Sequence, residues 1–145
     1  MKILIDTNIV LDHLLQREPY CYDAEMLFRL VQGGVFDAYI NTSSVSDIAY
    51  ILKKSGIDTT MILQFLSELA SIIKFIATTK LTLDNVILNK PIDIEDGLQE
   101  HSAIENQIEA IVTRDSSGFT WLPSMNAHTI VTEYFTSIVD GIHVL

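Results

Sequence analysis

Short apolar runs alternate along the chain with longer segments in which apolar residues recur at helical spacing. The short runs predict strands, because a buried strand needs only a few consecutive apolar residues between turns. The expected strands cover residues 2–5, 35–40, 74–77, 109–113 and 128–131. The longer segments predict helices, because apolar residues at this spacing share one face. The expected helices begin near residue 7, cover 20–32, follow cap candidates at 42–44 and 58–59, cover 93–107 and begin again after a cap at 132.

The order of these elements predicts the fold class. Residues 81–88 fit either kind of element and slightly favour a helix. Strands and helices then alternate along the chain, which is typical of an α/β fold with a mostly parallel sheet. No Pro-, Gly- or Ser-rich linker and no repeat interrupts the sequence, so we expect residues 1–145 to form a single domain.

The composition narrows the class of protein further. Hydrophobic residues make up 48% of the chain, which fits a compact core. The one cysteine, Cys21, cannot form an intrachain disulfide, fits a reducing compartment and is expected to be a small core residue. The N-terminus lacks the apolar stretch of a secretory signal, and residues 61–77 contain too many polar side chains to cross a membrane. We therefore expect a cytoplasmic protein with no membrane segment.

The charge balance restricts the partners. Nine Lys and Arg face nineteen Asp and Glu, which gives a net charge of −10. This charge argues against broad, nonspecific binding of nucleic acid. A nucleic-acid substrate would need metal ions that bridge to its phosphates, a local basic patch or a basic partner.

Four aspartates stand where an α/β fold brings turns together. Asp6 and Asp115 follow expected strands, and Asp47 and Asp96 lie in the first turns of expected helices. Ligands of parallel sheets gather outside the carboxyl ends of the strands, so these side chains are expected to share a crevice. Clustered carboxylates repel one another unless a hard cation neutralises them, which predicts a Mg²⁺ or Mn²⁺ site. Each aspartate taken alone is also explained as a helix or turn cap.

Several neighbours of these acids are further candidates. Thr7, Asn8 and Thr113 carry hydroxyl or amide groups that can orient water or phosphate. Arg114 could contact phosphate or form an exposed ion pair, and these alternatives stay open. Other candidates are Asp93 and Glu95, which compete with Asp96; Glu100, which shares its helical face; His101, for which packing is favoured over ligation; and Phe119 and Trp121, for which loop packing is favoured over base stacking.

Taken together, the motifs around the four acids resemble the PIN-domain family of metal-dependent ribonucleases, which includes VapC-like toxins. The matching segments are ILIDTNIVLD at 3–12, NTSSVSDI at 41–48, DIEDGLQ at 93–99 and IVTRDSSGF at 111–119. They span nearly the whole chain, and the first and last are the most specific. The resemblance implies a three-layer α/β/α fold with a mostly parallel central sheet of about five strands.

The same resemblance implies a Mg²⁺- or Mn²⁺-dependent endoribonuclease. Carried over by position, the acidic site consists of Asp6, Asp47, Asp96 and Asp115, with Thr7, Asn8 and Thr113 in support. Many relatives have Glu where this chain has Asp47, and the shorter side chain could ligate through water. Many relatives are also toxins of bacterial toxin–antitoxin pairs and often dimeric, so the implied partners are RNA, an antitoxin and a second copy of the chain.

Three rival functions fit parts of the pattern. A phosphatase with Asp6 as nucleophile would favour a second acid where Asn8 stands. A phospho-receiver would need paired acids and a phosphoacceptor strand that the sequence lacks. A PIN-like scaffold that binds RNA or protein without cutting remains open, because of Asp47 and the acidic surface.

Overall fold

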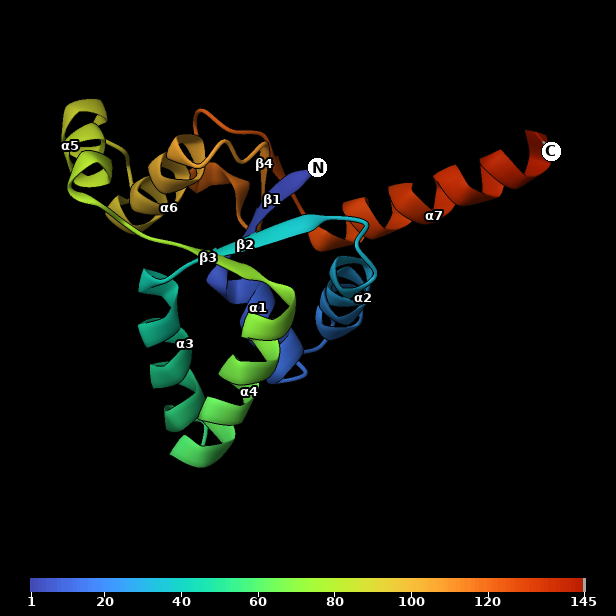
Figure 1. Cartoon of the computed structure of the whole chain (residues 1–145), viewed down its shortest axis with the longest axis horizontal. Coiled ribbons are helices and arrows are strands. Elements are labelled where there is room, and N and C mark those ends of the chain that lie inside the picture. The colour runs from blue at the N-terminus through green and yellow to red at the C-terminus, as the bar shows by residue number, and fades with distance from the viewer. Residues whose placement is uncertain (145) are drawn as a thin grey trace.

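The computed structural model describes residues 1–144 and shows a five-stranded parallel sheet between two layers of helices (Figure 1). The strands lie in the order β3-β2-β1-β4-β5, and every neighbouring pair is parallel. Their bounds are β1 Lys2–Ile5, β2 Asp37–Asn41, β3 Lys74–Ile76, β4 Ala110–Val112 and β5 Ser124–Met125. The predicted fold class is therefore confirmed.

Seven α-helices connect and cover these strands. Their bounds are α1 Thr7–Leu14, α2 Cys21–Gln32, α3 Ser43–Lys54, α4 Thr59–Ile72, α5 Lys80–Asn89, α6 Ile94–Glu105 and α7 Ala127–Val144, and a 3-10 turn, η1, covers Ser116–Gly118. Figure 1 shows α1 to α4 below the sheet and α5 and α6 above it, with α7 extending away from the body. No helix among residues 1–144 is long and apolar enough to cross a membrane.

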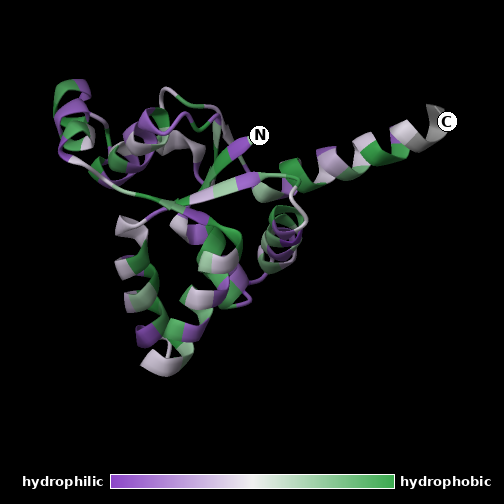
Figure 2. Cartoon of the chain, in the orientation of Figure 1, coloured by the Kyte–Doolittle hydropathy of each residue, from purple (hydrophilic) through white to green (hydrophobic). Residues whose placement is uncertain are grey.

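The alternation of side chains in β1 explains the two layers. Ile3 and Ile5 pack in the larger core, with the inner faces of α1 to α4 and the start of α7. Leu4 points to the opposite side and packs with Ile111 and with Ala103 of α6. All three β1 side chains are fully buried, as expected for a central strand covered on both faces. Figure 2 shows this concentration of hydrophobic residues along the strands and the surrounding helix faces.

The end of the chain differs from the sequence-based prediction. Residues 128–131, expected to be the fifth strand, lie in α7, and Thr132 is inside that helix rather than at its cap. The side-chain Oδ1 of Asn126 accepts a hydrogen bond from Thr129 N, which holds the first turn of α7. The actual β5 has only two residues and joins the sheet through Ile111 N, which donates to Pro123 O. A strand this short carries no apolar run to reveal it.

The other elements follow the predictions closely. The region 81–88 is helical, within α5, and Cys21 is buried. The expected cap at 42–44 is different in detail, because the Thr42 side chain makes no capping hydrogen bond. Asn41 at the end of β2 takes this role, and its Oδ1 accepts from Ser43 N and Ser43 Oγ. The start of α3 is thus fixed to the carboxyl end of the sheet.

The chain reverses its direction of travel across the sheet at β1. From β1 it passes to β2 and β3 on one side, and it later returns to β4 and β5 on the other side. The point between β1 and β4 is therefore a topological switch point, where the loops after the two strands diverge and leave a crevice. Asp6 follows β1 directly and Asp115 lies three residues past β4, so both belong to this crevice.

Candidate active site

An acidic pocket of about 350 Å³ opens at the carboxyl end of the sheet. The residues just after β1, one side of α3 and the start of α6 converge on it, so three segments distant in sequence contribute side chains. The side chains that line it are mostly polar: Asp6, Thr7, Asn8, Asp47, Tyr50, Ile51, Asp93, Glu95 and Asp96. Three of the four predicted acids therefore share one pocket.

Asp6 is held in a defined orientation at the bottom of this crevice. Its side chain is only 7% exposed, and its backbone N–H donates to Val112 O at 3.0 Å. Its Oδ2 accepts from Thr113 Oγ1 at 2.8 Å and its Oδ1 from Gln99 Nε2 at 3.4 Å. Two donors that act on this carboxylate fix its rotamer.

Asp96 lies in the first turn of α6, which Asp93 caps by accepting from Asp96 N at 2.9 Å. Its pKa is raised to about 6, first by burial and then by the negative charges of Asp93, Asp6, Glu95 and Asp115. The carboxyl group also lies directly against Gly118, where a Cβ atom would overlap it. Asp96 therefore experiences the charges of several segments at once.

Asp47 and Glu95 form the exposed wall of the pocket. Asp47 sits in the early part of α3, at the rim. The pKa of Glu95 is raised, first by desolvation and then by the charges of Asp47, Asp6 and Asp93. Glu95 is thus a further acidic member of the pocket, as its sequence position beside Asp96 had indicated.

Asp115 occupies a different position from the other three predicted acids. Its Oδ1 accepts from Ser117 N at 3.0 Å and from Ser117 Oγ at 2.6 Å, and these bonds lower its pKa. It lines a neighbouring cavity instead of the acidic pocket, although its charge contributes to the raised pKa of Asp96. The structure therefore places Asp115 at the border of the acidic pocket.

Thr113 links the two loops of the crevice. Its hydroxyl donates to Asp6 Oδ2 and accepts from Asp115 N at 3.1 Å, so one side chain contacts both strand-end acids. The Oγ1 of Thr7 is buried in the pocket wall and has no hydrogen-bond partner among the described residues. Asn8 is exposed and lines both the acidic pocket and the neighbouring cavity. The three supporting residues named from sequence thus surround the acids.

Two residues beside the acids were missed from sequence. Gln99, almost fully buried, donates to Asp6, and Gly118 makes room for the carboxyl of Asp96. Gln99 lies three positions after Asp96 on the same helix, so helical spacing places the two on one face but does not reveal the contact with Asp6. No signal in the sequence shows that Gly118 must approach Asp96.

Glu100, expected to support the acidic site, has another role. Its buried carboxylate accepts from the backbone N–H groups of Thr120, Trp121 and Leu122 at 2.5 to 3.1 Å. It therefore anchors the loop between β4 and β5. His101 packs against Trp121 with ring centroids 5.0 Å apart, as favoured from sequence.

The donor chemistry of the pocket fits a hard divalent cation. Carboxylate oxygens are the ligands that Mg²⁺ and Mn²⁺ prefer, and the unpartnered Thr7 hydroxyl offers one more oxygen. The like charges that raise the pKa of Asp96 are the repulsion that a cation would relieve. Within residues 1–144, however, no three His, Cys, Asp or Glu side chains are grouped closely enough to form a ready-made metal site.

Comparisons with known proteins agree with this architecture. A sequence model of the PIN domain matches residues 2–117, and a search of curated proteins found no match. A toxin–antitoxin complex from Klebsiella pneumoniae is similar in structure, with a TM-score of 0.64, 15% identity and coverage of 86% of this chain and 97% of that chain.

Two further solved structures are similar to the same extent. VapBC2 from Rickettsia felis, bound to a DNA fragment from their promoter, gives a TM-score of 0.61 and 17% identity over 87% of this chain and 98% of that chain. PAE2754 from Pyrobaculum aerophilum gives 0.62 and 13% identity over 92% and 88%. At these identities the likeness demonstrates a shared fold.

Proposed function

This chain belongs to the PIN-domain family, and on that premise we propose that it is a divalent-metal-dependent endoribonuclease that hydrolyses phosphodiester bonds of RNA. The proposed acidic site consists of Asp6, Asp47, Asp96 and Asp115. Thr7, Asn8 and Thr113 support it, and the proposed cofactor is Mg²⁺ or Mn²⁺. The observation that carries the proposal is the convergence of acids at the switch point, where burial first and then the neighbouring acids raise the pKa of Asp96 to about 6.

Each residue of the acidic site would have its own role in the reaction. Asp6, Asp96 and Asp115 would hold the cation, and the chemistry that a bound cation would supply is the activation of water for hydrolysis. Thr113 and Gln99 keep Asp6 in the orientation that the structure shows. The exposed carboxylate of Asp47 contributes through water, because it stands at the rim of the pocket.

The proton on Asp96 links metal binding to pH. With a pKa of about 6, this carboxyl is protonated in a large fraction of molecules below that pH. A cation must then displace the proton, so metal affinity falls as the pH drops through this range.

The cellular role we propose is that of a toxin in a toxin–antitoxin pair. Two of the structural neighbours are toxin–antitoxin proteins, one of them bound to DNA from its promoter. A net charge of −10 would complement a basic antitoxin, and a partner of that kind would compensate for the acidity of this chain. We further propose that the chain forms a homodimer and acts in the cytoplasm.

One observation favours a second candidate, a PIN-like scaffold that binds RNA or protein without cutting. No ready-made group of three metal-ligating side chains is present in the described part of the chain. A scaffold needs no such group, whereas a nuclease must assemble it when the cation binds.

Calorimetric titration of Mn²⁺ into the protein, paired with an RNA cleavage assay, separates these two functions. We expect the wild type to bind Mn²⁺ and to cleave RNA in a chelator-sensitive way. Asp6→Asn and Asp115→Asn should abolish cleavage while they leave the thermal unfolding curve nearly unchanged. Asp84→Asn is the matched control, because Asp84 is an exposed α5 residue outside the acidic pocket. A wild type that neither binds Mn²⁺ nor cleaves RNA would overturn the nuclease in favour of the scaffold.

A further inference from the structure

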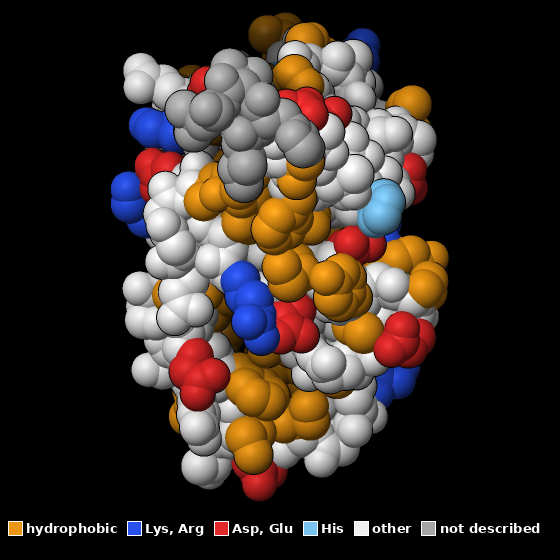
Figure 3. Space-filling view, turned by 90° about the vertical axis from the view of Figure 1, so that its right-hand side faces the viewer, with side chains coloured by type: hydrophobic (Ala, Val, Ile, Leu, Met, Phe, Trp, Pro, Cys, Tyr) orange, Lys and Arg blue, Asp and Glu red, His pale blue; other side chains and the backbone are white. Residues whose placement is uncertain are grey.

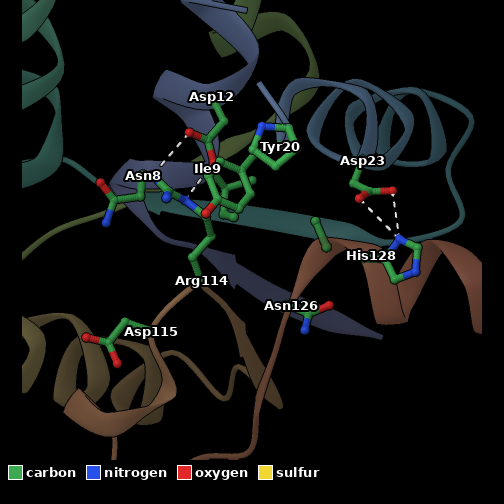
Figure 4. A pocket seen from close by; sticks show the side chains of 11 residues that line it. Asn8, Ile9, Asp12, Tyr20, Asp23, Arg114, Asp115, Asn126 and His128 are labelled. Carbon is green, nitrogen blue, oxygen red and sulfur yellow. Dashed lines mark hydrogen bonds and ion pairs between the residues drawn. The ribbon is translucent and has the colours of Figure 1, made fainter. Parts of the chain in front are cut away.

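A second cavity adjoins the acidic pocket and is larger, at about 540 Å³ (Figure 4). Asn8 lines both spaces, and Asp115 lies on the border, so the two are neighbours. The other walls come from α1, from the loop that leads to α2 and the start of that helix, from the loop after β4 and from the start of α7. A volume of this size is in the range of sites that bind small organic ligands.

Arg114 is the principal polar group of this cavity. Figure 4 shows its side chain reaching from the loop after β4 towards Asp12, with the ring of Tyr20 beside it. Its Nε lies 2.9 Å from Asp12 Oδ2 and its Nη2 lies 3.2 Å from Asp12 Oδ1, and its guanidinium carbon is 4.1 Å from the Tyr20 ring centroid. A two-point ion pair and an aromatic face together fix the plane of the guanidinium.

Two arginines approach the same buried carboxylate at this cavity. Asp12 is fully buried, and Arg17 Nη1 also approaches its Oδ1, at 3.8 Å. Two guanidinium groups thus share one carboxylate in a chain of net charge −10, while Asp23 and Asp115 also line the cavity. Among the residues described, Arg114 is the only Lys or Arg that lines either cavity.

Some N–H donors of the Arg114 guanidinium are not engaged by Asp12. Its side chain is 30% exposed, and Asp12 engages only one edge of the guanidinium. A guanidinium carries five N–H donors in a planar fork that suits phosphate, so the remaining ones can hydrogen bond to a phosphate in the cavity. Asn8 and Asn126 add amide donors and acceptors, and Ile9 and Ala127 add apolar surface on which a base could pack.

We propose that this cavity binds one nucleotide of single-stranded RNA next to the scissile phosphate, with the phosphate of that nucleotide on Arg114. Asp12 and Tyr20 are positioning residues that keep the guanidinium turned towards the cavity. This inference rests on the proposed nuclease function for the place of the scissile bond. It also explains how an acidic chain engages a polyanion, since the guanidinium of Arg114 is held in place beside the acids.

The test compares Arg114→Gln with Arg29→Gln. Arg29 is an exposed α2 residue paired with Glu25, so its change removes the same charge away from both cavities. Binding of a fluorescently labelled, single-stranded oligoribonucleotide is measured by anisotropy in chelator at several salt concentrations, and cleavage is measured with Mn²⁺. We expect Arg114→Gln to weaken binding about tenfold. It should also shift the slope of log K against log salt by about +0.7, the value for one phosphate contact on a single strand. Arg29→Gln should bind as the wild type does.

Arg114→Gln leaves the buried Asp12 with one partner fewer, which could impair folding. A second variant therefore separates a loss of binding from a loss of folding. Asp12→Asn combined with Arg114→Gln removes both charges of the pair, and we expect it to show the same weaker binding and the same change of slope. Asp12→Asn alone keeps Arg114 but removes the ion pair that positions its guanidinium. We therefore expect KM for RNA to rise more than kcat falls.

The possible outcomes separate this inference from the proposed function. Wild-type affinity and slope in both Arg114 variants, with cleavage intact in the wild type, would overturn the nucleotide site and leave the nuclease standing. The arginine cluster would then be free to bind a protein carboxylate. Arg114-dependent binding by a wild type that cleaves nothing would overturn the nuclease and keep the cavity as an RNA site. A wild type that neither binds nor cleaves RNA would overturn both.

Discussion

The acidic side chains of the candidate site differ in how firmly they are held. Asp6 accepts from Thr113 and Gln99, and Asp115 accepts twice from Ser117. Among the hydrogen bonds of the described residues, none reaches the carboxyl group of Asp96. Burial first, and then the like charges around it, raise the pKa of Asp96 to about 6. Asp96 therefore lowers the stability of the metal-free protein, as residues that serve a reaction often do.

Replacing Asp96 with Asn should stabilise the metal-free protein at neutral pH. The pKa rises from 3.8 to about 6 on folding, so the folded state binds more protons than the unfolded state between these values. The wild-type free energy of unfolding therefore decreases as the pH rises from about 4 to about 6. Because Asp96 is partly exposed, we discount the full linkage and expect Asp96→Asn to gain about 1 kcal/mol at pH 7. The corresponding rise in Tm is about 3 °C by thermal unfolding in chelator.

The control for this experiment is the pH profile itself. Below pH 4 the wild-type carboxyl is protonated, so the advantage of Asp96→Asn should vanish there. Asp84→Asn, an exposed change, should follow the wild type at every pH. A stability difference that stays constant between pH 4 and pH 7 would refute the account of repulsion around Asp96.

The sequence reveals the acids of the site more readily than their neighbours. Asp6 and Asp115 are found because they follow apolar runs, and a parallel sheet brings such positions to one edge. Gln99 and Gly118 escape because their roles depend on what lies opposite them. Helical spacing gives the face on which Gln99 lies but does not show that Asp6 occupies that face. The contact of Gly118 with Asp96 joins two loops whose separation no local pattern encodes.

At the scale of elements, two adjacent residues of α6 have different roles. Its Gln99 donates to Asp6 in the crevice, and the adjacent Glu100 accepts the backbone N–H groups of Thr120, Trp121 and Leu122. Glu100 thereby determines the path of the loop between β4 and β5, which contains Asp115. The helix thus connects the acidic pocket to the loop that borders it.

Removing the Glu100 carboxylate should loosen that loop more than it loosens the sheet. Glu100→Ala leaves three backbone N–H groups without their acceptor, and we expect a loss of about 2–3 kcal/mol in urea unfolding. Glu100→Gln keeps one acceptor oxygen and should lose about half as much. Hydrogen exchange should speed up at residues 120–122, and the exposed change Glu133→Gln should alter neither measurement. Unchanged exchange at these amides in Glu100→Ala would show that the loop has other anchors.

The elements also show where the pattern of the sequence is insufficient. The first four strands each contain an apolar run, and all four were predicted within two residues at each end. The fifth was placed on 128–131, because Ile130 and Val131 resemble a strand when only their neighbours are considered. In the structure these two side chains pack into the larger core from one face of α7, beside Ala127. Helical and strand readings of four residues cannot be separated by periodicity alone.

At the scale of the whole molecule, α7 lies beyond the part that matches the PIN domain. The match ends at residue 117, before β5 and before α7 begins at Ala127. The first turns of α7 pack on α2 and complete the wall of the Arg114 cavity, whereas its later turns leave Phe135 and Val139 at the surface with Tyr22. Figure 3 shows hydrophobic side chains gathered along this face of the molecule.

The net charge of −10 should govern how RNA reaches the site. The Debye length falls from about 30 Å at 0.01 M salt to about 8 Å at 0.15 M, so added salt screens the long-range repulsion and spares the short contact at Arg114. We expect kcat/KM for RNA to rise between these concentrations, opposite to the usual loss for basic nucleic-acid-binding proteins. Replacing exposed Glu68 and Glu133, both outside the two cavities, with Gln should increase the rate mainly at low salt. A steady fall of kcat/KM with salt would mean that attraction at several basic groups outweighs the repulsion of the chain as a whole.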